Sequence, residues 1–166
     1  MDLELRNQRV LITGGSRGIG LACAAGFLRE GARVAIVSRS AENLAKACAS
    51  LAEGEGEYAK DVVAVSADLT DIAAAARAVE QAVAALGAID ILVTSAGAAK
   101  RRPPDELTPQ LWQDAMAAKY FSYINVIDPV VKRMAHQGRG AIVNIVGMGG
   151  KLANPAHLAG GAANAA

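Results

Sequence analysis

One short segment near the start of the chain carries four glycines at fixed spacing, Thr13-Gly14-Gly15-Ser16-Arg17-Gly18-Ile19-Gly20. It follows an apolar run and precedes a helical pattern. Glycine lets the backbone approach a ligand closely, and the free N–H groups at a helix N-terminus bind anions such as a pyrophosphate. Glycines at an ordinary turn lack this strand-before, helix-after context. The segment therefore predicts a dinucleotide-binding site.

The residues that end the next apolar run indicate which dinucleotide this is. An acid about 20 residues beyond the glycines would hold the ribose 2′-hydroxyl of NAD. The chain has Ser38-Arg39-Ser40 there, and Arg17 in the glycine segment adds a second guanidinium. Planar guanidinium groups suit a phosphate. We therefore expect NADP(H), the alternative being that both arginines are solvated surface charges.

The pattern T-G-x-x-x-G-x-G resembles the short-chain dehydrogenase/reductase family, in a register that extends over all 166 residues. The family's acidic adenine contact is matched by Asp68 in Ala67-Asp68-Leu69. Its N-N-A-G stretch is matched by Thr94-Ser95-Ala96-Gly97, in which both asparagines are replaced. The cofactor-binding residues that the glycine segment, the arginine argument and this resemblance imply are Gly14, Ser16, Arg17, Gly18, Ile19, Gly20, Ser38, Arg39, Asp68, Leu69, Ser95, Ala96 and Gly97.

The same resemblance marks four catalytic positions, and none carries the family's residue. The family has an Asn after the fourth strand, a Ser after the fifth, and a Tyr and Lys four apart on the next helix. In the family the Tyr is the general acid/base, the Lys lowers its pKa, and the Ser holds the substrate oxygen. In register these positions are Lys119, Gly147, Gly160 and Asn164. The usual oxygen holder and proton donor are therefore absent.

Two of these replacements are reciprocal, because the family's Asn is Lys119 here and its Lys is Asn164. In the family the two positions lie near each other through a water. The exchange would keep an ammonium near the nicotinamide ribose, supplied from the other helix, although loss of constraint would give the same swap. We expect Lys119 Nζ within ~6 Å of the Asn164 side chain, the reach of a one-water bridge.

Few side chains remain that could donate a proton. Tyr123 lies one turn after Lys119 on the same helix face, whereas Tyr120 points roughly 100° away. His157 lies one turn before the family's Tyr position and has a suitable pKa. His157 could equally be a polar group at a helix start, and Tyr123 a core or subunit contact. The candidate catalytic set is Lys119, His157, Tyr123 and Asn164.

The elements that would position these residues alternate along the chain. Apolar runs predict strands, and Ala-rich stretches between them predict helices. The strands are 8–13, 33–37, 62–66, 89–94 and 141–146, and the helices are 19–30, 41–51, 72–86, 109–136 and 155–166. This alternation predicts an α/β, Rossmann-like, doubly wound parallel sheet of order 3-2-1-4-5 with helices on both faces.

Several local features refine these elements. Residues 53–57, Glu-Gly-Glu-Gly-Glu, predict a solvated turn, and Lys100–Pro104 predicts a loop. Thr108 should cap the long helix, and Pro129 inside it should kink or divide it. Asn154 and Pro155 predict an N-cap and a first helical residue.

The bulk composition fits a single dinucleotide-binding domain over 1–166. The chain is 52% apolar but only 4% aromatic, and its net charge of +1 favours neither nucleic acid nor a membrane as partner. No run reaches the ~18 apolar residues of a membrane span. The first six residues include acids, unlike a signal peptide, and the two cysteines have no metal-ligand spacing. We expect a cytoplasmic protein with no metal.

The end of the sequence carries two further expectations. Compared with complete family members the C-terminal third is missing, and the fifth strand would be left as an exposed Val/Ile-rich edge. We therefore expect the natural chain to continue. In the family the helices that correspond to 109–136 and 155–166 pack into dimers and tetramers, which implies a homodimer or homotetramer.

Three functions are compatible with these residues. The first is an NADP(H)-dependent oxidoreductase on a carbonyl or alcohol substrate, with a rearranged proton relay. The second is a catalytically inactive NADP(H)-binding regulatory protein, and the third is a scaffold subunit that supports a catalytic partner. The resemblance favours the first.

Overall fold

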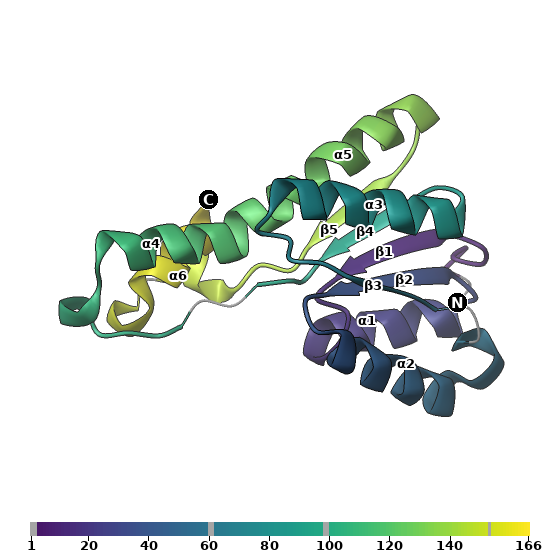
Figure 1. Cartoon of the computed structure of the whole chain (residues 1–166), viewed down its shortest axis with the longest axis horizontal. Coiled ribbons are helices and arrows are strands. Elements are labelled where there is room, and N and C mark those ends of the chain that lie inside the picture. Colours follow the sequence, from purple (N-terminus) through teal and green to yellow (C-terminus); the bar gives the residue numbers. More distant parts are fainter. Residues whose placement is uncertain (1–2, 60–61, 98–99, 153) are drawn as a thin grey trace.

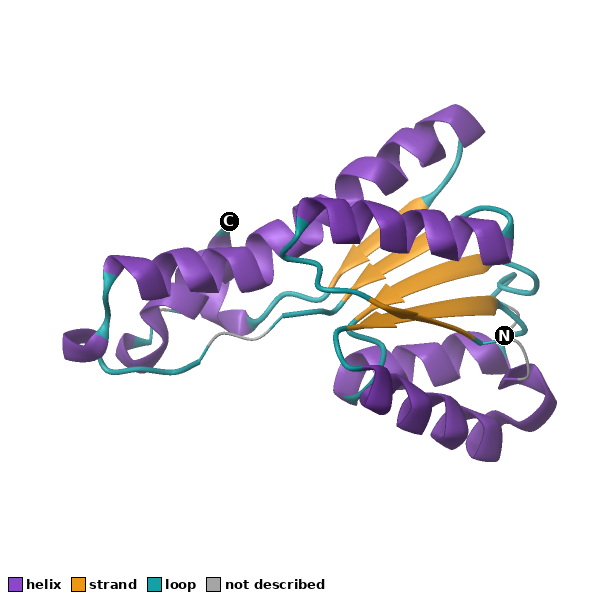
Figure 2. Cartoon of the chain, viewed as in Figure 1, coloured by secondary structure: helices purple, strands orange, loops and turns teal. Residues whose placement is uncertain are grey.

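A computed structural model describes residues 3–59, 62–97, 100–152 and 154–166 of the chain. Five parallel strands form one sheet in the order β3-β2-β1-β4-β5, which confirms the predicted order (Figures 1 and 2). The strands are β1 Arg9–Thr13, β2 Arg33–Ser38, β3 Val63–Ser66, β4 Ile91–Thr94 and β5 Ala141–Asn144. The strand order reverses between β1 and β4, and ligands bind at the carboxyl ends of strands beside such a reversal.

Helices cover both faces of the sheet. On one face lie α1 Gly18–Arg29 and α2 Ala41–Glu55, and on the other lie α3 Ile72–Leu86 and α5 Ser122–Gln137 (Figure 1). Two further helices, α4 Pro109–Met116 and α6 Leu158–Ala165, pack against each other beyond the carboxyl ends of the strands. Residues 100–121, 147–152 and 154–166 are called the outer lobe below.

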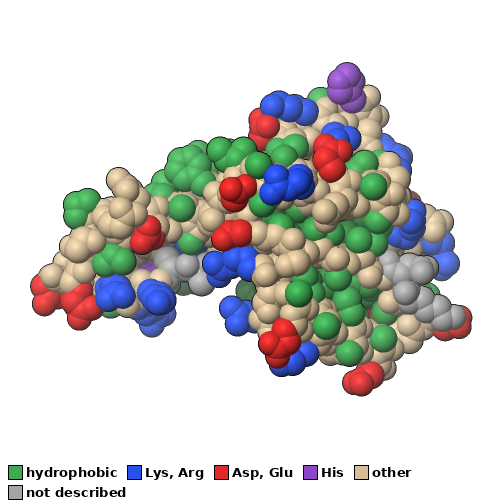
Figure 3. All heavy atoms as spheres, viewed as in Figure 1, with side chains coloured by type: hydrophobic (Ala, Val, Ile, Leu, Met, Phe, Trp, Pro, Cys, Tyr) green, Lys and Arg blue, Asp and Glu red, His purple; other side chains and the backbone are tan. Residues whose placement is uncertain are grey.

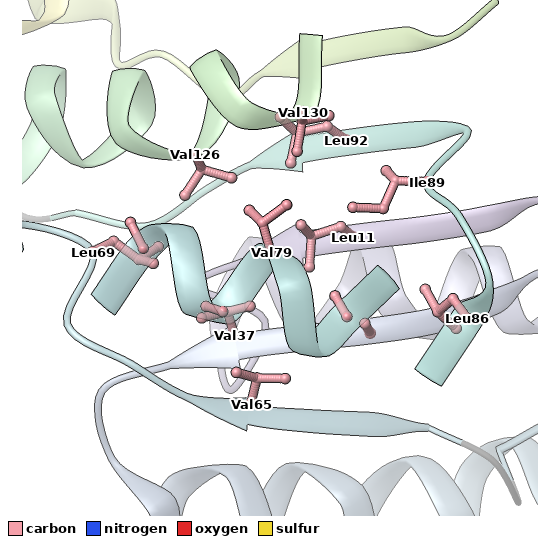
Figure 4. Packing of buried hydrophobic residues seen from close by; sticks show 14 of the residues in the cluster. Leu11, Val37, Val65, Leu69, Val79, Leu86, Ile89, Leu92, Val126 and Val130 are labelled. Carbon is pink, nitrogen blue, oxygen red and sulfur yellow. The ribbon is translucent and has the colours of Figure 1, made fainter. Parts of the chain in front are cut away.

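The core on both sides of the sheet is aliphatic. Between the sheet and α3 and α5, Leu11 and Leu92 pack with Val79, Val126 and Val130, all essentially inaccessible to solvent (Figure 4). The opposite face is built in the same way from α1 and α2 side chains. The three inner strands β1, β2 and β4 are buried on both faces and are continuous apolar runs, which is why the sequence pattern located them.

The second helix is longer than the sequence pattern predicted. The solvated turn expected at residues 53–57 was wrong, because α2 continues to Glu55. The Glu55 carboxylate accepts hydrogen bonds from Arg29 of α1, at 2.8 Å from Nη2. The helix then ends at Gly56, whose φ of 55° favours glycine, and a 3₁₀ turn follows over Gly56–Ala59. The ion pair to α1 offsets the low helix propensity of the Gly-containing segment.

The predicted long helix is divided, but not at its proline. Thr108 caps α4 as expected, its Oγ1 accepting from Leu111 N. A π-helical turn over Ala117–Phe121 then separates α4 from α5, and α5 runs through Pro129. Of the two outcomes expected at Pro129, a kink or a division, the division was therefore wrong.

Shorter elements complete the chain. Pro104–Glu106, Met148–Gly150 and Pro155–His157 form 3₁₀ turns, the first of which takes Pro104 out of the predicted loop. Asn154 caps the last of them as predicted, its Oδ1 accepting from Ala156 N. Strand β5 pairs with β4, and Val143 is 47% exposed. In the part of the chain described, no helix is both long and apolar enough to cross a membrane.

Candidate functional site

The glycine loop between β1 and α1 is shaped by close backbone contacts. A Cβ on Gly14 would lie 2.8 Å from Ala96 N, and one on Gly20 would collide with the Gly14 carbonyl. Gly14 also has a φ of 67°. Gly18 shares a positive φ of 56° but faces open space, with nothing within 4 Å of a Cβ. The loop thus packs tightly against neighbouring backbone at Gly14 and Gly20 and has free space at Gly18. A bound pyrophosphate requires such an open side of the loop.

The start of α1 supplies the donors for such a ligand. Arg17 is the N-cap residue, its side chain makes no capping hydrogen bond, and the first turn contains no acid. The first N–H groups of the helix are therefore directed at the space above Gly18, where they attract an anion. Ile19 is 60% exposed beside them. These residues fit the pyrophosphate of a dinucleotide.

The predicted ribose end is assembled at the tips of β2 and β3. Ser16 Oγ donates to Ser38 Oγ at 2.8 Å, which joins the glycine loop to β2. Asp68 Oδ1 accepts from Thr70 N at 3.0 Å and from Thr70 Oγ1 at 2.8 Å. These bonds, together with the nearby Arg39 charge, hold the pKa of Asp68 below its usual range. Arg17 and Arg39 are both exposed at this edge.

Two residues that sequence reasoning did not single out hold the cofactor segments together. Thr13 Oγ1 accepts from Ser95 N at 3.1 Å and from Ala96 N at 3.2 Å, which links the ends of β1 and β4. Asn125 Nδ2 of α5 donates to Leu69 O at 3.0 Å. Thr13 is part of the glycine pattern and could have been found there, whereas nothing in the sequence marks Asn125.

Gly97 couples this region to the π turn. Its φ is 111°, and a Cβ there would collide with the carbonyl of Ala118. The π turn is held by Ser122, whose Oγ donates to the carbonyls of Ala118 at 2.9 Å and Lys119 at 3.2 Å. π turns often occur at functional sites, and this one contains Lys119.

Lys119 and Asn164 are brought together as expected from their reciprocal exchange. Lys119 Nζ donates to Asn164 Oδ1 at 2.7 Å, a direct contact that is closer than the one-water bridge allowed for. Burial lowers the pKa of the Lys119 ammonium from its ordinary value. The ammonium therefore releases its proton more readily than a solvated lysine does.

Tyr123 lies nearby but its hydroxyl is engaged. The hydroxyl donates to Ile145 O at 2.8 Å, which ties α5 to the end of β5. Burial raises the pKa of the phenol. Tyr120 instead stacks edge-on against Phe121, with ring centroids 5.1 Å apart. Lys119, Tyr123 and Asn164 all border a pocket of about 270 Å³ between α5, β5 and α6.

The glycine turn after β5 lies against α6 and His157. A Cβ on Gly150 would be 2.8 Å from Asn164 O, so the two backbones are in contact. A Cβ on Gly149 would be 3.3 Å from His157 Cδ2. His157 Nδ1 is buried and has no hydrogen-bond partner in the described part of the chain. Asn164 and His157 therefore lie against one glycine turn, Lys119 is hydrogen-bonded to Asn164, and Tyr123 is bonded to the residue after β5.

Comparison with known proteins identifies this arrangement. A family model for short chain dehydrogenases matches residues 8–166. The chain belongs to this family. Gluconate 5-dehydrogenase of Gluconobacter oxydans (strain 621H) is 38% identical to this chain over 152 residues, 92% of this chain and 58% of that protein. D-threitol dehydrogenase of Mycolicibacterium smegmatis is 34% identical over 158 residues, 95% of this chain and 59% of that protein.

Solved structures show the same fold. L-sorbose reductase of Gluconobacter frateurii, solved with NADPH and L-sorbose, superposes with a TM-score of 0.90 at 28% identity, over 99% of this chain and 62% of that one. Levodione reductase gives a TM-score of 0.91 at 28% identity, over 96% of this chain and 62% of that one. The chain thus spans between 58% and 62% of the length of these relatives.

Proposed function

We propose that this short-chain dehydrogenase interconverts an alcohol and a carbonyl on a polyol- or sugar-like substrate with NADP(H), using a rearranged proton relay. The observation that carries the proposal is the Lys119–Asn164 hydrogen bond of 2.7 Å beside the glycine turn. In a site that had lost its function, nothing would keep residues 119 and 164 complementary to each other. Here the exchanged lysine and asparagine are hydrogen-bonded. The substrate class follows the relatives, which are named for gluconate, D-threitol and L-sorbose.

The cofactor would lie across the carboxyl ends of the strands. The glycine loop and α1 would hold its pyrophosphate, and Arg17 and Arg39 with Ser16 and Ser38 would hold the 2′-phosphate of NADP(H). Figure 3 shows Lys and Arg side chains on this face where the outer lobe meets the sheet, which suits a phosphorylated ligand. When bound, the nicotinamide supplies or accepts a hydride. Two similar structures were solved with NADPH.

The chain's own residues would manage the proton. Lys119 would present its ammonium beside the ribose and orient Asn164. His157 would donate or accept the proton at the substrate oxygen, because its imidazole lies against the glycine turn beside Asn164. Tyr123 would act mainly by position, since its hydroxyl is bonded to β5. This division would replace the Ser and Tyr of the family with residues from three different segments.

Cofactor binding and turnover test the proposal separately. NADPH and NADH affinities are measured by calorimetry, and turnover is followed with gluconate, D-threitol and L-sorbose. NADPH should bind at least about tenfold more tightly, since a charged contact contributes ~1.5–3 kcal/mol. Lys119→Ala should abolish turnover, while Lys132→Ala, which removes a surface ion pair with Asp128, should not.

The outcomes separate the candidate functions. Tight NADPH binding without turnover on any substrate would favour a regulatory or scaffold subunit over an enzyme. Equal affinities for NADPH and NADH would contradict the arginine argument. A cytoplasmic location and a homodimer or homotetramer through helices 109–136 and 155–166 remain predictions. For the latter, Phe121 and Val131 expose apolar surface on the first of these segments.

A further inference from the structure

The Asn164 side chain presents two different atoms to its two neighbours. A lysine ammonium can only donate hydrogen bonds, so the carboxamide oxygen must face Lys119, and the amide nitrogen is turned toward the glycine turn. Nδ2 lies 2.9 Å from the position that a Cβ on Gly147 would take, and 3.3 Å from the corresponding position on Gly149. None of the hydrogen bonds in the described part of the chain uses this nitrogen.

The backbone conformation at position 147 does not explain why this residue is a glycine. Gly147 has φ −73° and ψ 146°, an extended conformation that any residue adopts. A side chain at 147 would, however, meet the Asn164 amide nitrogen at less than ordinary contact distance. The hydrogen bond from Lys119 Nζ to Asn164 Oδ1 restrains the amide in this position. The amide therefore occupies the place in which a side chain at 147 would stand.

His157 also lies against this glycine turn, at Gly149. A Cβ on Gly149 would lie 3.3 Å from both Asn164 Nδ2 and His157 Cδ2. The Asn164 amide nitrogen and the His157 imidazole therefore lie against the same glycine turn. Lys119 need not touch a ligand oxygen held by this amide, because its hydrogen bond to Oδ1 already orients the amide.

We propose that the Asn164 amide nitrogen holds the substrate's carbonyl or alcohol oxygen, at the edge of the pocket of about 270 Å³ that Lys119, Tyr123 and Asn164 border, with Lys119 fixing the orientation of the amide. This inference rests on the proposed function and assigns the oxygen-binding donor to α6 rather than to the end of β5. Gly147 and Gly149 are then required by the site, because a side chain at either position would press on the Asn164 amide nitrogen.

The variant Asn164→Asp tests the role of the amide nitrogen separately from that of the amide oxygen. The carboxylate has the same shape and still accepts from Lys119, but it can no longer donate. With L-sorbose and NADPH as the probes, kcat/KM should fall by about 10²–10³-fold, the effect of losing one oxyanion donor, while the calorimetric NADPH affinity is retained. An unchanged kcat/KM, or an equal loss in NADPH affinity, would overturn the inference.

A second measurement needs no substrate. Gly147→Ser should lower the thermal unfolding midpoint in the wild-type background, because its side chain meets the Asn164 amide, and should lower it much less in Asn164→Ala. Val146→Ser, at an exposed neighbouring position, should have the same effect in both backgrounds. Additive effects of Gly147→Ser and Asn164→Ala would contradict the packing on which the inference depends.

Failure of the two proposals can be told apart. Wild-type protein that turns over none of the tested substrates would end the proposed function and with it the oxygen-binding role, whatever the unfolding midpoints show. If the wild-type protein turns over a substrate and Asn164→Asp does so equally well, only the assignment of the oxygen-binding donor is wrong.

Discussion

At the scale of single residues, Lys119 is unusual because its partner is an amide and not a carboxylate. Burial lowers the pKa of its ammonium, and Asn164 Oδ1 accepts a hydrogen bond from it without adding a compensating negative charge. A lysine in this situation keeps its charge over a narrower pH range than a solvated lysine does. The pH dependence of turnover therefore reports on it.

If the charged form of Lys119 is needed, kcat/KM should fall as pH rises through this lowered pKa, below the ordinary lysine value of about 10.4. Lys119→Arg should move this alkaline limit to higher pH, because arginine stays protonated to a pKa above about 12. The measurement is the pH profile of kcat/KM for both proteins. The same limit in both would mean that another group sets it.

Arg39 is the second residue for which a single change gives a clear result. Arg39→Ala should reduce the preference for NADPH over NADH by roughly tenfold or more, since a charge-assisted contact contributes ~1.5–3 kcal/mol. Arg133→Ala is the matched control, because it removes the same charge from an ion pair with Glu80 between α5 and α3. Calorimetry with both cofactors checks this, and an unchanged ratio in the Arg39 variant would exclude a contact with the 2′-phosphate.

The sequence predicted the proximity of Lys119 and Asn164 but not the orientation of the amide. The resemblance fixed the register, and the reciprocal exchange indicated that the two side chains meet. Orientation depends on which atoms of the amide face Lys119 and Gly147, and that depends on the backbone path of the turn. No residue type encodes this path on its own.

At the scale of elements, the π turn over Ala117–Phe121 is the feature that sequence patterns missed. The helical sequence pattern continues from α4 through this turn into α5, and no proline or glycine directly precedes the turn. Its position is set from outside, by Gly97 against the Ala118 carbonyl. By contrast, α3 was predicted at its exact bounds, because Asp71 caps it and Gly87 ends it. Local signals predict helix ends well, and tertiary contacts decide irregular turns.

Gly97→Ala should therefore cost more than an ordinary glycine substitution. Gly138 also has a positive φ, 69°, but nothing lies within 4 Å of its Cβ position. Gly138→Ala should reduce the free energy of unfolding by about 1 kcal/mol through backbone strain alone. Gly97→Ala should reduce it by more, about 2–3 kcal/mol, and should also weaken turnover by shifting Lys119. Denaturant unfolding checks both, and equal losses would show that the contact with the π turn carries no strain.

At the scale of the whole molecule, one ion pair joins the starts of the two central strands. Asp90 accepts from Arg9 Nε at 2.6 Å and from Arg9 Nη2 at 2.7 Å, and Arg139 lies 3.2 Å away. The Asp90 side chain is only 7% exposed. Hydrogen bonds from Arg9 hold the pKa of Asp90 below its usual range. The pair therefore fastens β1 to β4 at the end opposite the cofactor loop.

Asp90→Asn should reduce the free energy of unfolding by about 2 kcal/mol at neutral pH, less than for a fully buried pair because Arg9 is partly exposed. The folded-state pKa is depressed, so the stabilisation is present above the unfolded value of about 3.9 and is lost as pH falls through the lowered pKa. The difference between the two proteins should close in acid. Denaturant unfolding across this range tests it, with the surface variant Asp128→Asn expected to stay within about 0.5 kcal/mol. A difference that persisted in strong acid would rule out the ion pair as its cause.

The direct contact between Lys119 and Asn164 also has a consequence for the history of the sequence. Restoring the arrangement of the family needs both positions to change, and the two intermediates are unequal. Asn164→Lys alone would set two ammonium groups against each other where a 2.7 Å hydrogen bond now stands, which is strongly unfavourable. Lys119→Asn alone would leave two amides, which can still pair. The favourable route between the two arrangements therefore passes through the protein that has asparagine at both positions. No single mutation converts one arrangement into the other.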